Sequence, residues 1–175
     1  MKHDYRYDGE GLLLRPLEEK DIESLRLLRN RPENRIWFFD SDLITPEGQR
    51  AWFERYLTKE NDYMFSVFLP EAPDAFVGAV ALYDYEPETN SFEVGRLLLD
   101  SKNMPRYGMG IELVAAVCKL AEQIGERKRE RRLRARVSSD NERSLCCFVN
   151  NEFIIDGTTE ENGRSVILLS RRVCK

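Results

Sequence analysis

The chain has 175 residues, a length that suits one domain with a single hydrophobic core. Its 27 Lys and Arg against 31 Asp and Glu give a net charge of −4, so no overall basic field favours a nucleic acid as partner. Residues 1–11 are polar and no apolar run is long enough to span a membrane, so we expect a cytoplasmic protein without a leader peptide or a membrane partner.

The cysteines and the single histidine give little basis for a metal site. Cys118, Cys146, Cys147 and Cys174 lack Cys-x-x-Cys spacing, and His3 lies in an N-terminus that we expect to be flexible or loosely packed over residues 1–11. We therefore predict no metal, no histidine general base, and cysteines that are reduced and buried.

The first part of the chain predicts a short strand and two helices. Residues 12–17 form an apolar run with a proline, which suits a strand that ends there. Apolar residues recur at helical spacing from Ile22 to Leu28, and Pro32 pushes the residue before it out of the helical region. Thr45 is a suitable N-cap for the next helix, with proline at its first position.

A group of aromatic residues separates these two helices. Trp37, Phe38 and Phe39 are consecutive in a polar loop, so they cannot all face inward, and we expect some of them to line a pocket. Trp52 and Phe53 lie in the second helix and are better explained by packing of that helix onto a sheet.

The rest of the chain predicts further strands and two more helices. A charge run at 126–132 is interpreted as a solvated helix end rather than an RNA contact, because it contains two acids and no aromatic residue. The predicted strands span residues 63–69, 76–85, 92–99, 133–137, 153–155 and 165–169, and the predicted helices span 110–124 and 141–150.

A glycine loop joins the strand at 92–99 to the helix that follows it. Gly108 and Gly110 lack a Cβ, so the backbone can turn tightly and approach a ligand, and the first amides of a helix have no acceptor within it. Such a turn can hold phosphate oxygens, although glycine before a helix is also ordinary turn punctuation. The sequence lacks the patterns of a P-loop and of a dinucleotide-binding loop.

Two segments of the chain resemble motifs of one enzyme family. Residues 105–110 match the pattern Gln/Arg-x-x-Gly-x-Gly/Ala at both glycines, with Pro105 in place of its first residue, and residues 136–144 are similar to the segment Val-x-x-x-Asn-x-x-Ser. Both are motifs of the GNAT family of acyl-CoA-dependent N-acetyltransferases. Residues 14–53 resemble the branch related to ribosomal-protein N-acetyltransferases, and some members of the broader branch acetylate amino groups on nucleotide-linked sugars.

The resemblance implies a single GNAT domain of the α+β (α/β) class, with a mixed central sheet of six to seven strands and helices on both faces. It also implies that the parallel strands 92–99 and 133–137 splay apart and leave backbone groups unpaired, so that the pantetheine arm of acetyl-CoA can pair with strand 92–99. The expected contacts of acetyl-CoA are Leu97, Leu98, Leu99, Arg106, Tyr107, Gly108, Met109, Gly110, Asn141 and Ser144.

Acetyl transfer to an amine requires a group that removes a proton, because an alkylamine has a pKa of roughly 10. Glu93 is the first candidate, since it lies in the strand beside the co-substrate and alternates with apolar neighbours. The other interpretation of Glu93 is a carboxylate that faces solvent or pairs with an arginine such as Arg96. Asp84, near the end of the neighbouring strand, is the second candidate, and the resemblance implies an oxyanion contact from a backbone amide near Leu98.

Protonation of the leaving thiolate departs from the family pattern. The resemblance places a tyrosine acid where this chain has Phe148, and Glu152 replaces the glycine of the usual Gly-Phe pair. Tyr83, Tyr85 or Ser144 could supply the proton instead, as could water, or the reaction could depend mainly on proximity. We retain Tyr83 with Glu93 and Asp84 as the catalytic candidates.

The acceptor is expected to be a small-molecule primary amine. Arg29, Arg31 and Arg35 precede Trp37 and Phe38; arginines can hold phosphates, and aromatic rings can stack on a base or sugar. We therefore expect an amino sugar, for example one linked to a nucleotide, bound by Arg29, Arg35, Trp37 and Phe38. The alternatives are a protein N-terminus or ribosomal protein as acceptor and, in another class, a non-catalytic acyl-CoA-binding module; homodimer formation is left open.

Overall fold

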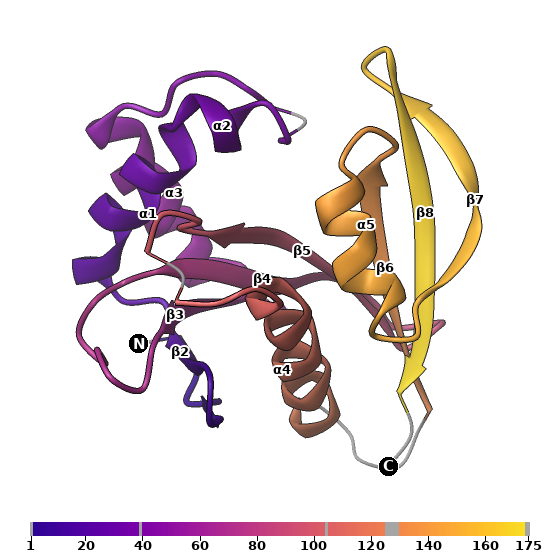
Figure 1. Ribbon diagram of the computed structural model, residues 1–175, viewed down its shortest axis with the longest axis horizontal. Coiled ribbons are helices and arrows are strands. Elements are labelled where there is room, and N and C mark those ends of the chain that lie inside the picture. Colours follow the sequence, from indigo (N-terminus) through magenta and orange to yellow (C-terminus); the bar gives the residue numbers. More distant parts are fainter. Residues whose placement is uncertain (1, 39, 104, 125–129, 174–175) are drawn as a thin grey trace.

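Residues 2–38, 40–103, 105–124 and 130–173 are described by the structure, a computed structural model. In this part of the chain, eight strands form one mixed sheet in the order β1-β2-β3-β4-β5-β6-β8-β7 (Figure 1). The strands are β1 (Tyr7–Asp8), β2 (Leu13–Pro16), β3 (Tyr63–Phe68), β4 (Gly78–Glu86), β5 (Ser91–Leu99), β6 (Arg131–Ser138), β7 (Ile154–Glu161) and β8 (Arg164–Val173). The helices are α1 (Ile22–Asn30), α2 (Pro32–Arg35), α3 (Pro46–Thr58), α4 (Met109–Gln123) and α5 (Glu142–Val149).

α1 ends and α3 begins where the sequence predicts, whereas the short helix α2 was not predicted. The Thr45 hydroxyl accepts a hydrogen bond of 3.0 Å from the Gly48 amide, and Pro46 occupies the first position of α3. α1 ends before Arg31, whose backbone is extended because Pro32 follows it. None of the described helices is long and apolar enough to cross a membrane.

The sheet is covered on both faces, as predicted. Along β4, Val80 and Leu82 pack in the core that contains helix α4, whereas Ala79 and Ala81 pack in the core that contains α1 and α3. All four side chains are fully buried, and Figure 1 shows α1 and α3 on the side of the sheet opposite to α4. Burial of both faces explains why this strand is apolar without alternation.

β5 and β6 are parallel neighbours that pair over only three residues. After the pair Glu93–Arg134, the described part of β5 continues beside β4 alone, while β6 pairs with β8 (Figure 1). The predicted splayed strand pair is therefore confirmed, and one backbone edge of β5 lacks a strand partner beyond Glu93. The three pairs are Ser91–Arg132, Phe92–Leu133 and Glu93–Arg134.

A β-bulge bends β5 just beyond this separation. β5 has one residue more than β4 between the paired positions Gly95 and Leu98, and Arg96 in the bulge has a φ of 52°. The Arg96 guanidinium donates to both carboxylate oxygens of Asp62, at 2.7 and 3.0 Å, and lies 4.2 Å from the centre of the Tyr83 ring. These contacts hold the bulged residue in a backbone region that side chains rarely adopt.

The described part of the N-terminal segment, residues 2–11, is packed rather than frayed, which corrects the prediction made for residues 1–11. Tyr7–Asp8 forms β1, so the described sheet has eight strands where six to seven were expected. The His3 ring lies 4.9 Å from that of Phe65, and the Lys2 ammonium donates to the Tyr56 carbonyl at 2.8 Å. Polar residues at the start of the chain are thus held by aromatic rings that lie far away in sequence.

Two predictions about polar side chains were wrong. Of the charge run at 126–132, residues 126–129 lie outside the described residues, but Arg131 is buried at the start of β6 and donates to the Ala121 and Ile124 carbonyls at the end of α4. Cys146 is exposed on α5 rather than buried, whereas Cys118 is buried as expected. Cys118, Cys146 and Cys147 are free thiols, and Cys174 lies outside the described residues.

Candidate active site

The separation of β5 from β6 brings a buried carboxylate to the point where the two strands part. Glu93 is 8% exposed and its flanking residues, Phe92 and Val94, are buried in the α4 core, so its own side chain points to the face covered by α1 and α3. Tyr83 lies beside it on β4 and packs against the core of that same face. Gly95 makes room for this tyrosine, because a Cβ there would lie 2.6 Å from the Tyr83 oxygen.

Three neighbouring side chains form a continuous network with Glu93. The Tyr83 hydroxyl donates to Glu93 Oε1 at 2.6 Å, and Arg136 Nε donates to the two carboxylate oxygens at 3.0 and 3.2 Å. Arg136 Nη1 also donates to both oxygens of Glu161 on β7, at 3.1 and 3.2 Å. The network crosses the gap, because Glu93 belongs to β5 and Arg136 to β6.

The two donors keep their protons at neutral pH. Burial raises the pKa of Tyr83 well above its usual value, and the adjacent negative charge of Glu93 raises it further. Burial lowers the pKa of Arg136, but its contacts with Glu93 and Glu161 outweigh that effect and raise it overall. Glu93 thus accepts hydrogen bonds from a neutral phenol and a charged guanidinium, which fix the orientation of its carboxylate.

The glycine loop is open to solvent at the N-terminus of α4. Gly108 has a φ of 89°, and a Cβ placed there would meet no atom within 4 Å, while Tyr107 is fully exposed. The Gly108 carbonyl accepts from the amides of Ile111 and Glu112, at 2.9 and 3.1 Å, so the helical hydrogen bonds begin after this turn. The backbone amides before Ile111 have no acceptor within the helix, so they are available to bind an anion.

This geometry agrees with the match to known families. A family model described as an acetyltransferase (GNAT) domain matches residues 11–154. The chain belongs to the GNAT acetyltransferase family. It is an N-acetyltransferase with acetyl-CoA as co-substrate.

Solved structures of other proteins share the fold of this GNAT acetyltransferase. Spermidine N-acetyltransferase from Vibrio cholerae, solved with CoA and spermine, is 15% identical over 94% of this chain and 96% of its own, with a TM-score of 0.78. A domain from Methanocaldococcus jannaschii is 21% identical over 93% of this chain and 98% of its own, with a TM-score of 0.75. A structure provisionally named as a phosphinothricin N-acetyltransferase is 21% identical over 94% and 99%, with a TM-score of 0.73. No protein of curated function matches the sequence.

The predicted acetyl-CoA contacts lie on β5, in the glycine loop and at the start of α5. Leu97 and Leu99 point into the α4 core and Leu98 into the opposite core, which leaves their backbone at the open edge of β5. Asn141 caps α5, since its Oδ1 accepts from the Ser144 amide at 3.1 Å. That contact uses the side-chain oxygen of Asn141. Its side-chain nitrogen, Nδ2, can then donate a hydrogen bond to a ligand.

Two residues of the glycine loop have structural partners. Arg106 forms an ion pair with Glu112 at 2.5 Å, within the first turn of α4. A Cβ on Gly110 would lie 2.6 Å from the Cys147 sulfur, so this glycine is needed where α4 packs against α5. Met109 between them is buried. The motif therefore serves helix packing at Gly110 as well as the open turn at Gly108.

The predicted catalytic residues do not all come together. Tyr83 contacts Glu93, but the Asp84 side chain is half exposed and its carboxylate lies 3.4 Å from the Lys59 ammonium. Phe148, at the position of the family's tyrosine, is buried against the ring of Phe153 at 5.0 Å and offers no proton. Glu93 and Tyr83 are the candidates that the structure places at the gap.

The predicted acceptor residues separate into structural and accessible ones. Arg31 donates to both oxygens of the buried Asp100, at 2.6 and 3.1 Å, and so fixes the end of β5. The Arg29 guanidinium lies 3.5 Å from the centre of the Phe38 ring and donates to the Asp40 carbonyl. Two of the three arginines expected at the acceptor site therefore have partners within the fold.

Of that set, Trp37 keeps an exposed side chain and Arg35 a partly exposed one. Arg35 is half-buried at the end of α2, and Trp37 is 39% exposed in the segment that follows. Phe39, the last of the three consecutive aromatics, lies outside the described residues. Trp52 and Phe53 pack in the core of α1 and α3, as predicted.

Sequence reasoning missed the partners of Glu93 on the far side of the gap. An arginine partner was considered, but Arg96 was named for it, and Arg96 contacts Asp62 instead. Arg136 alternates with buried Ala135 and Val137 on β6, so its orientation away from the α4 core could have been predicted. Its proximity to Glu93 could not, because that depends on where two parallel strands stop pairing.

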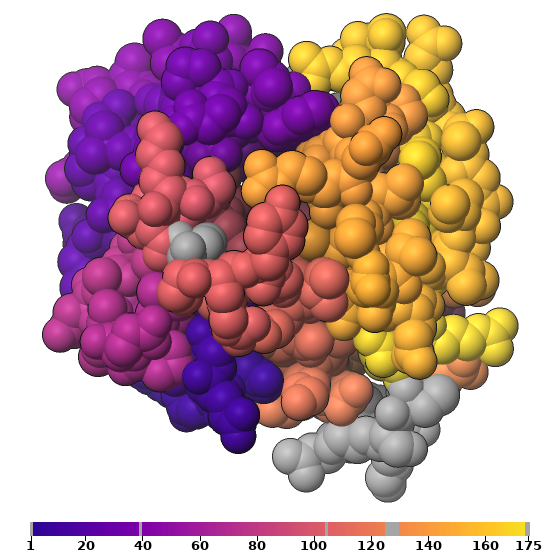
Figure 2. Space-filling model, in the orientation of Figure 1, coloured from indigo at the N-terminus to yellow at the C-terminus, as the bar shows by residue number. Residues whose placement is uncertain are grey.

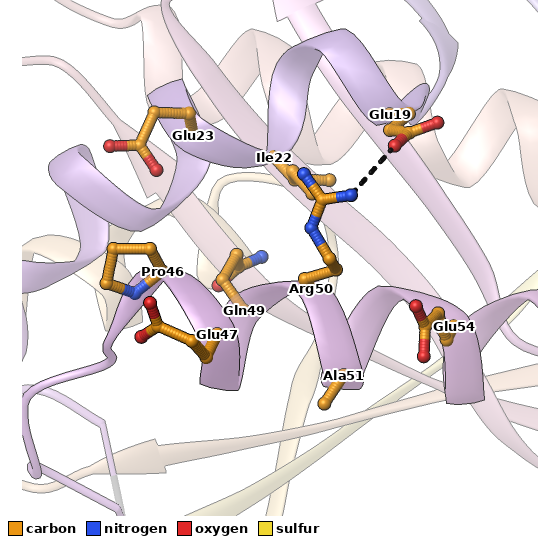
Figure 3. A pocket seen from close by; sticks show the side chains of 9 residues that line it. All are labelled: Glu19, Ile22, Glu23, Pro46, Glu47, Gln49, Arg50, Ala51 and Glu54. Atoms are coloured by element: carbon orange, nitrogen blue, oxygen red, sulfur yellow. Dashed lines mark ion pairs between the residues drawn. The ribbon is translucent and has the colours of Figure 1, made fainter.

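A separate cavity of about 500 Å³ lies between α1 and α3 (Figure 3). Figure 3 shows Arg50 reaching across it to Glu19, with 3.6 Å between the two groups. Its lining shares no residue with the network around Glu93, so we do not assign the acyl transfer to it. The described residues also contain no group of three or more His, Cys, Asp or Glu placed to hold a metal ion. The cavity is lined by Glu19, Ile22, Glu23, Pro46, Glu47, Gln49, Arg50, Ala51 and Glu54.

Proposed function

We propose that this N-acetyltransferase acts on the primary amine of a small polar acceptor, such as an amino sugar or its nucleotide-linked form, by direct transfer from acetyl-CoA. The observation that carries the proposal is the Glu93 carboxylate, buried where β5 and β6 separate and held by Tyr83 and Arg136. This carboxylate faces the side of the sheet covered by α1 and α3, and the glycine loop opens at the N-terminus of α4 on the other side. The two substrates would approach from opposite faces and meet at the gap.

The chain fits acetyl-CoA through its backbone. The edge of β5 beyond Glu93 has no strand partner among the described residues, and the amide chain of pantetheine can supply one. The amides of residues 106–110 would bind the diphosphate, with Gly108 allowing close approach. Asn141 and Ser144, at the start of α5, would bind the pantetheine arm from the side of β6.

Glu93 and Tyr83 would carry the proton transfers. The acceptor amine is mainly protonated at neutral pH, with a pKa of roughly 10, and Glu93 would take its proton directly or through water. The backbone amide near Leu98 would stabilise the oxyanion. The Tyr83 hydroxyl is 2.6 Å from Glu93, so it could donate to the leaving thiolate and recover a proton from the carboxylate.

The acceptor would lie over Glu93, against the segment that follows α2. Arg35 and Trp37 support a phosphate-bearing or sugar-like acceptor, because a guanidinium can hold a phosphate and an indole can stack on a ring. The support rests on these two residues, since Arg29 and Arg31 have structural partners. Arg35→Ala combined with Trp37→Ala should raise the KM for a nucleotide-linked amino sugar. An unchanged KM would exclude this compound as the acceptor.

Thiol release from acetyl-CoA tests the proposal. The panel contains a free amino sugar, its nucleoside diphosphate derivative, spermidine, and a short peptide with a free N-terminus. We expect turnover with a small amine and its loss in Glu93→Gln. Thermal stabilisation by CoA without turnover of any amine, or turnover of the peptide alone, contradicts the proposed acceptor class.

A further inference from the structure

One hydrogen-bonded contact bridges the two halves of the molecule above the gap. Arg164 Nη1 donates to the Ile36 carbonyl at 2.8 Å and to the Phe38 carbonyl at 3.4 Å. Arg164 opens β8 next to the β7–β8 turn, whereas Ile36 and Phe38 follow α2 (Figure 1). Figure 2 shows the surface of the first helices beside that of the C-terminal part of the chain. We call these three residues the Arg164 bridge.

Each end of the Arg164 bridge is fixed by a second contact. On the helical side, the Arg29 guanidinium stacks on Phe38 at 3.5 Å from the ring centre. On the hairpin side, Glu161 pairs with Arg164 in the register of β7 and β8, yet its carboxylate binds Arg136. The Arg164 guanidinium is thereby left to reach the carbonyls across the gap.

The bridge is connected to the reacting groups through the same hairpin. Glu161 contacts Arg136, and Arg136 contacts Glu93, so the hairpin end that carries Arg164 is tied to the proposed base. The segment after α2 and the hairpin thus border the face of the sheet to which Glu93 points. An acceptor over Glu93 would lie between these two borders.

From this arrangement we propose that Arg164 is a specificity-determining residue that restricts the acceptor to small amines, an inference that rests on the proposed function. A small amine would need room only beside Glu93. An extended peptide adds about 3.3 Å of length per residue, so the chain that follows a reacting N-terminus would run into the bridge. Because Arg164 binds backbone carbonyls, it closes the site without touching the co-substrate.

Arg164→Ala breaks the bridge, and Arg164→Lys keeps a donor for the carbonyls. The matched control is Arg172→Ala, because Arg172 is an exposed arginine on the same strand whose ion-pair partner is Glu130. We expect Arg164→Ala to raise the KM for the small amine roughly fivefold, the effect of losing one or two exposed hydrogen bonds. Its kcat and its KM for acetyl-CoA should stay within about twofold of wild type.

The same variants are assayed with a short peptide that has a free N-terminus. We expect the ratio of kcat/KM for the peptide to that for the small amine to rise about tenfold in Arg164→Ala. Arg164→Lys should recover part of the change, and Arg172→Ala should show none.

A fluorescence measurement reports on the bridge without turnover. The chain has two tryptophans, so the Trp52→Phe background leaves Trp37, which lies between the two bridged carbonyls. Acrylamide quenching of Trp37 should increase in Arg164→Ala and stay unchanged in Arg172→Ala. Saturation with the small amine should decrease quenching in the parent.

The two ways of failing are distinguishable. A wild-type enzyme that releases no thiol with small amines contradicts the proposed function itself. Turnover of small amines with an unchanged peptide ratio and unchanged Trp37 quenching in Arg164→Ala overturns the role of Arg164 alone. A uniform fall in kcat with all acceptors also overturns it, because a residue that selects by size changes the ratio.

Discussion

The two edges of β5 are built from the same residues and behave differently. Toward β4 the strand is paired from Ser91 to Leu99, with two register shifts, whereas toward β6 it is paired only as far as Glu93. The paired edge anchors the strand in a ladder, and the free edge presents backbone groups to a ligand. An apolar, buried strand can therefore serve as a binding surface through its backbone alone.

Side chains contact each other across the gap where the backbones of β5 and β6 no longer pair. Glu93 and Arg136 meet across it, and Arg164 reaches the segment after α2 beyond it. The first contact is buried and the second exposed, so we expect the first to matter more for the reaction and the second more for the choice of acceptor.

Loss of the charge on Glu93 should have the largest effect. Glu93→Gln keeps the shape of the side chain but removes the proton acceptor, so kcat should fall by about 100-fold or more. Steady-state thiol release measures it, with Asp84→Asn as the control because that carboxylate is exposed and bound to Lys59. If both variants keep wild-type kcat, Glu93 is not the base.

Removal of Asp62 should destabilise the bulge that turns β5 away from its partner. The Asp62 side chain is 3% exposed and binds Arg96 through both oxygens, so Asp62→Ala should lower the free energy of unfolding by about 3 kcal/mol. Asp84→Ala is the matched control: it also contacts Lys59, but from an exposed position, and should cost under about 1 kcal/mol in urea unfolding. Equal losses would show that the bulge does not depend on this pair.

The part of the sheet on the β4 side of β5 should become less stable in acid because of His3, which packs on β3. Burial of this imidazole lowers its pKa from 6.5 to about 4. Above pH 6.5 it is neutral folded or unfolded; as the pH falls to 4 the unfolded chain takes the proton first, so stability declines. A fall in the pKa from 6.5 to about 4 corresponds to about 3 kcal/mol of unfolding free energy. Because His3 is partly exposed, we expect a loss of about 1–2 kcal/mol.

The difference between wild type and His3→Gln in unfolding free energy, measured from pH 7 to pH 4, isolates this effect from the carboxylates. His3 is the single histidine of the chain, so no other imidazole contributes. Amides of β3 should show the loss in hydrogen exchange and those of β8 should not. A pH-independent difference would mean that the N-terminal segment does not bury the ring.

Substitutions at two glycines with positive φ distinguish backbone strain from loss of a ligand contact. They should have the smallest effects of the variants considered. A Cβ on Gly108 or Gly163 meets no atom within 4 Å, so alanine at either should cost about 1 kcal/mol of backbone strain. Gly108→Ala should also raise the KM for acetyl-CoA, and Gly163→Ala should not. If the two variants have the same KM for acetyl-CoA, the loop does not bind the diphosphate.

The predictable parts of the structure were those set by local chemistry. Thr45 and Pro46 fix the start of α3 through backbone geometry, and the Gly108 turn follows from a conformation that other residues avoid. The position of Glu93 beside the gap followed from the family resemblance and from its alternation with Phe92 and Val94.

What could not be predicted depends on residues far apart in the chain. The Arg29 and Arg31 side chains suggested phosphate binding by their position near the aromatic residues, but they bind the Asp40 carbonyl and the Asp100 carboxylate. Sequence spacing shows which side chains are available and does not show which will find a partner in the fold. Arg136 shows the converse, because its contact with Glu93 exists only where two strands cease to pair.

Hydrogen exchange of the β5 backbone, resolved to single amides with and without CoA, tests the central claim most directly. The account predicts that CoA slows exchange at amides between Gly95 and Leu99 and in the 106–110 loop, while amides that β4 already pairs stay unchanged. Saturating CoA that leaves every amide between Gly95 and Leu99 unprotected would contradict the use of the free edge of β5 as the binding surface.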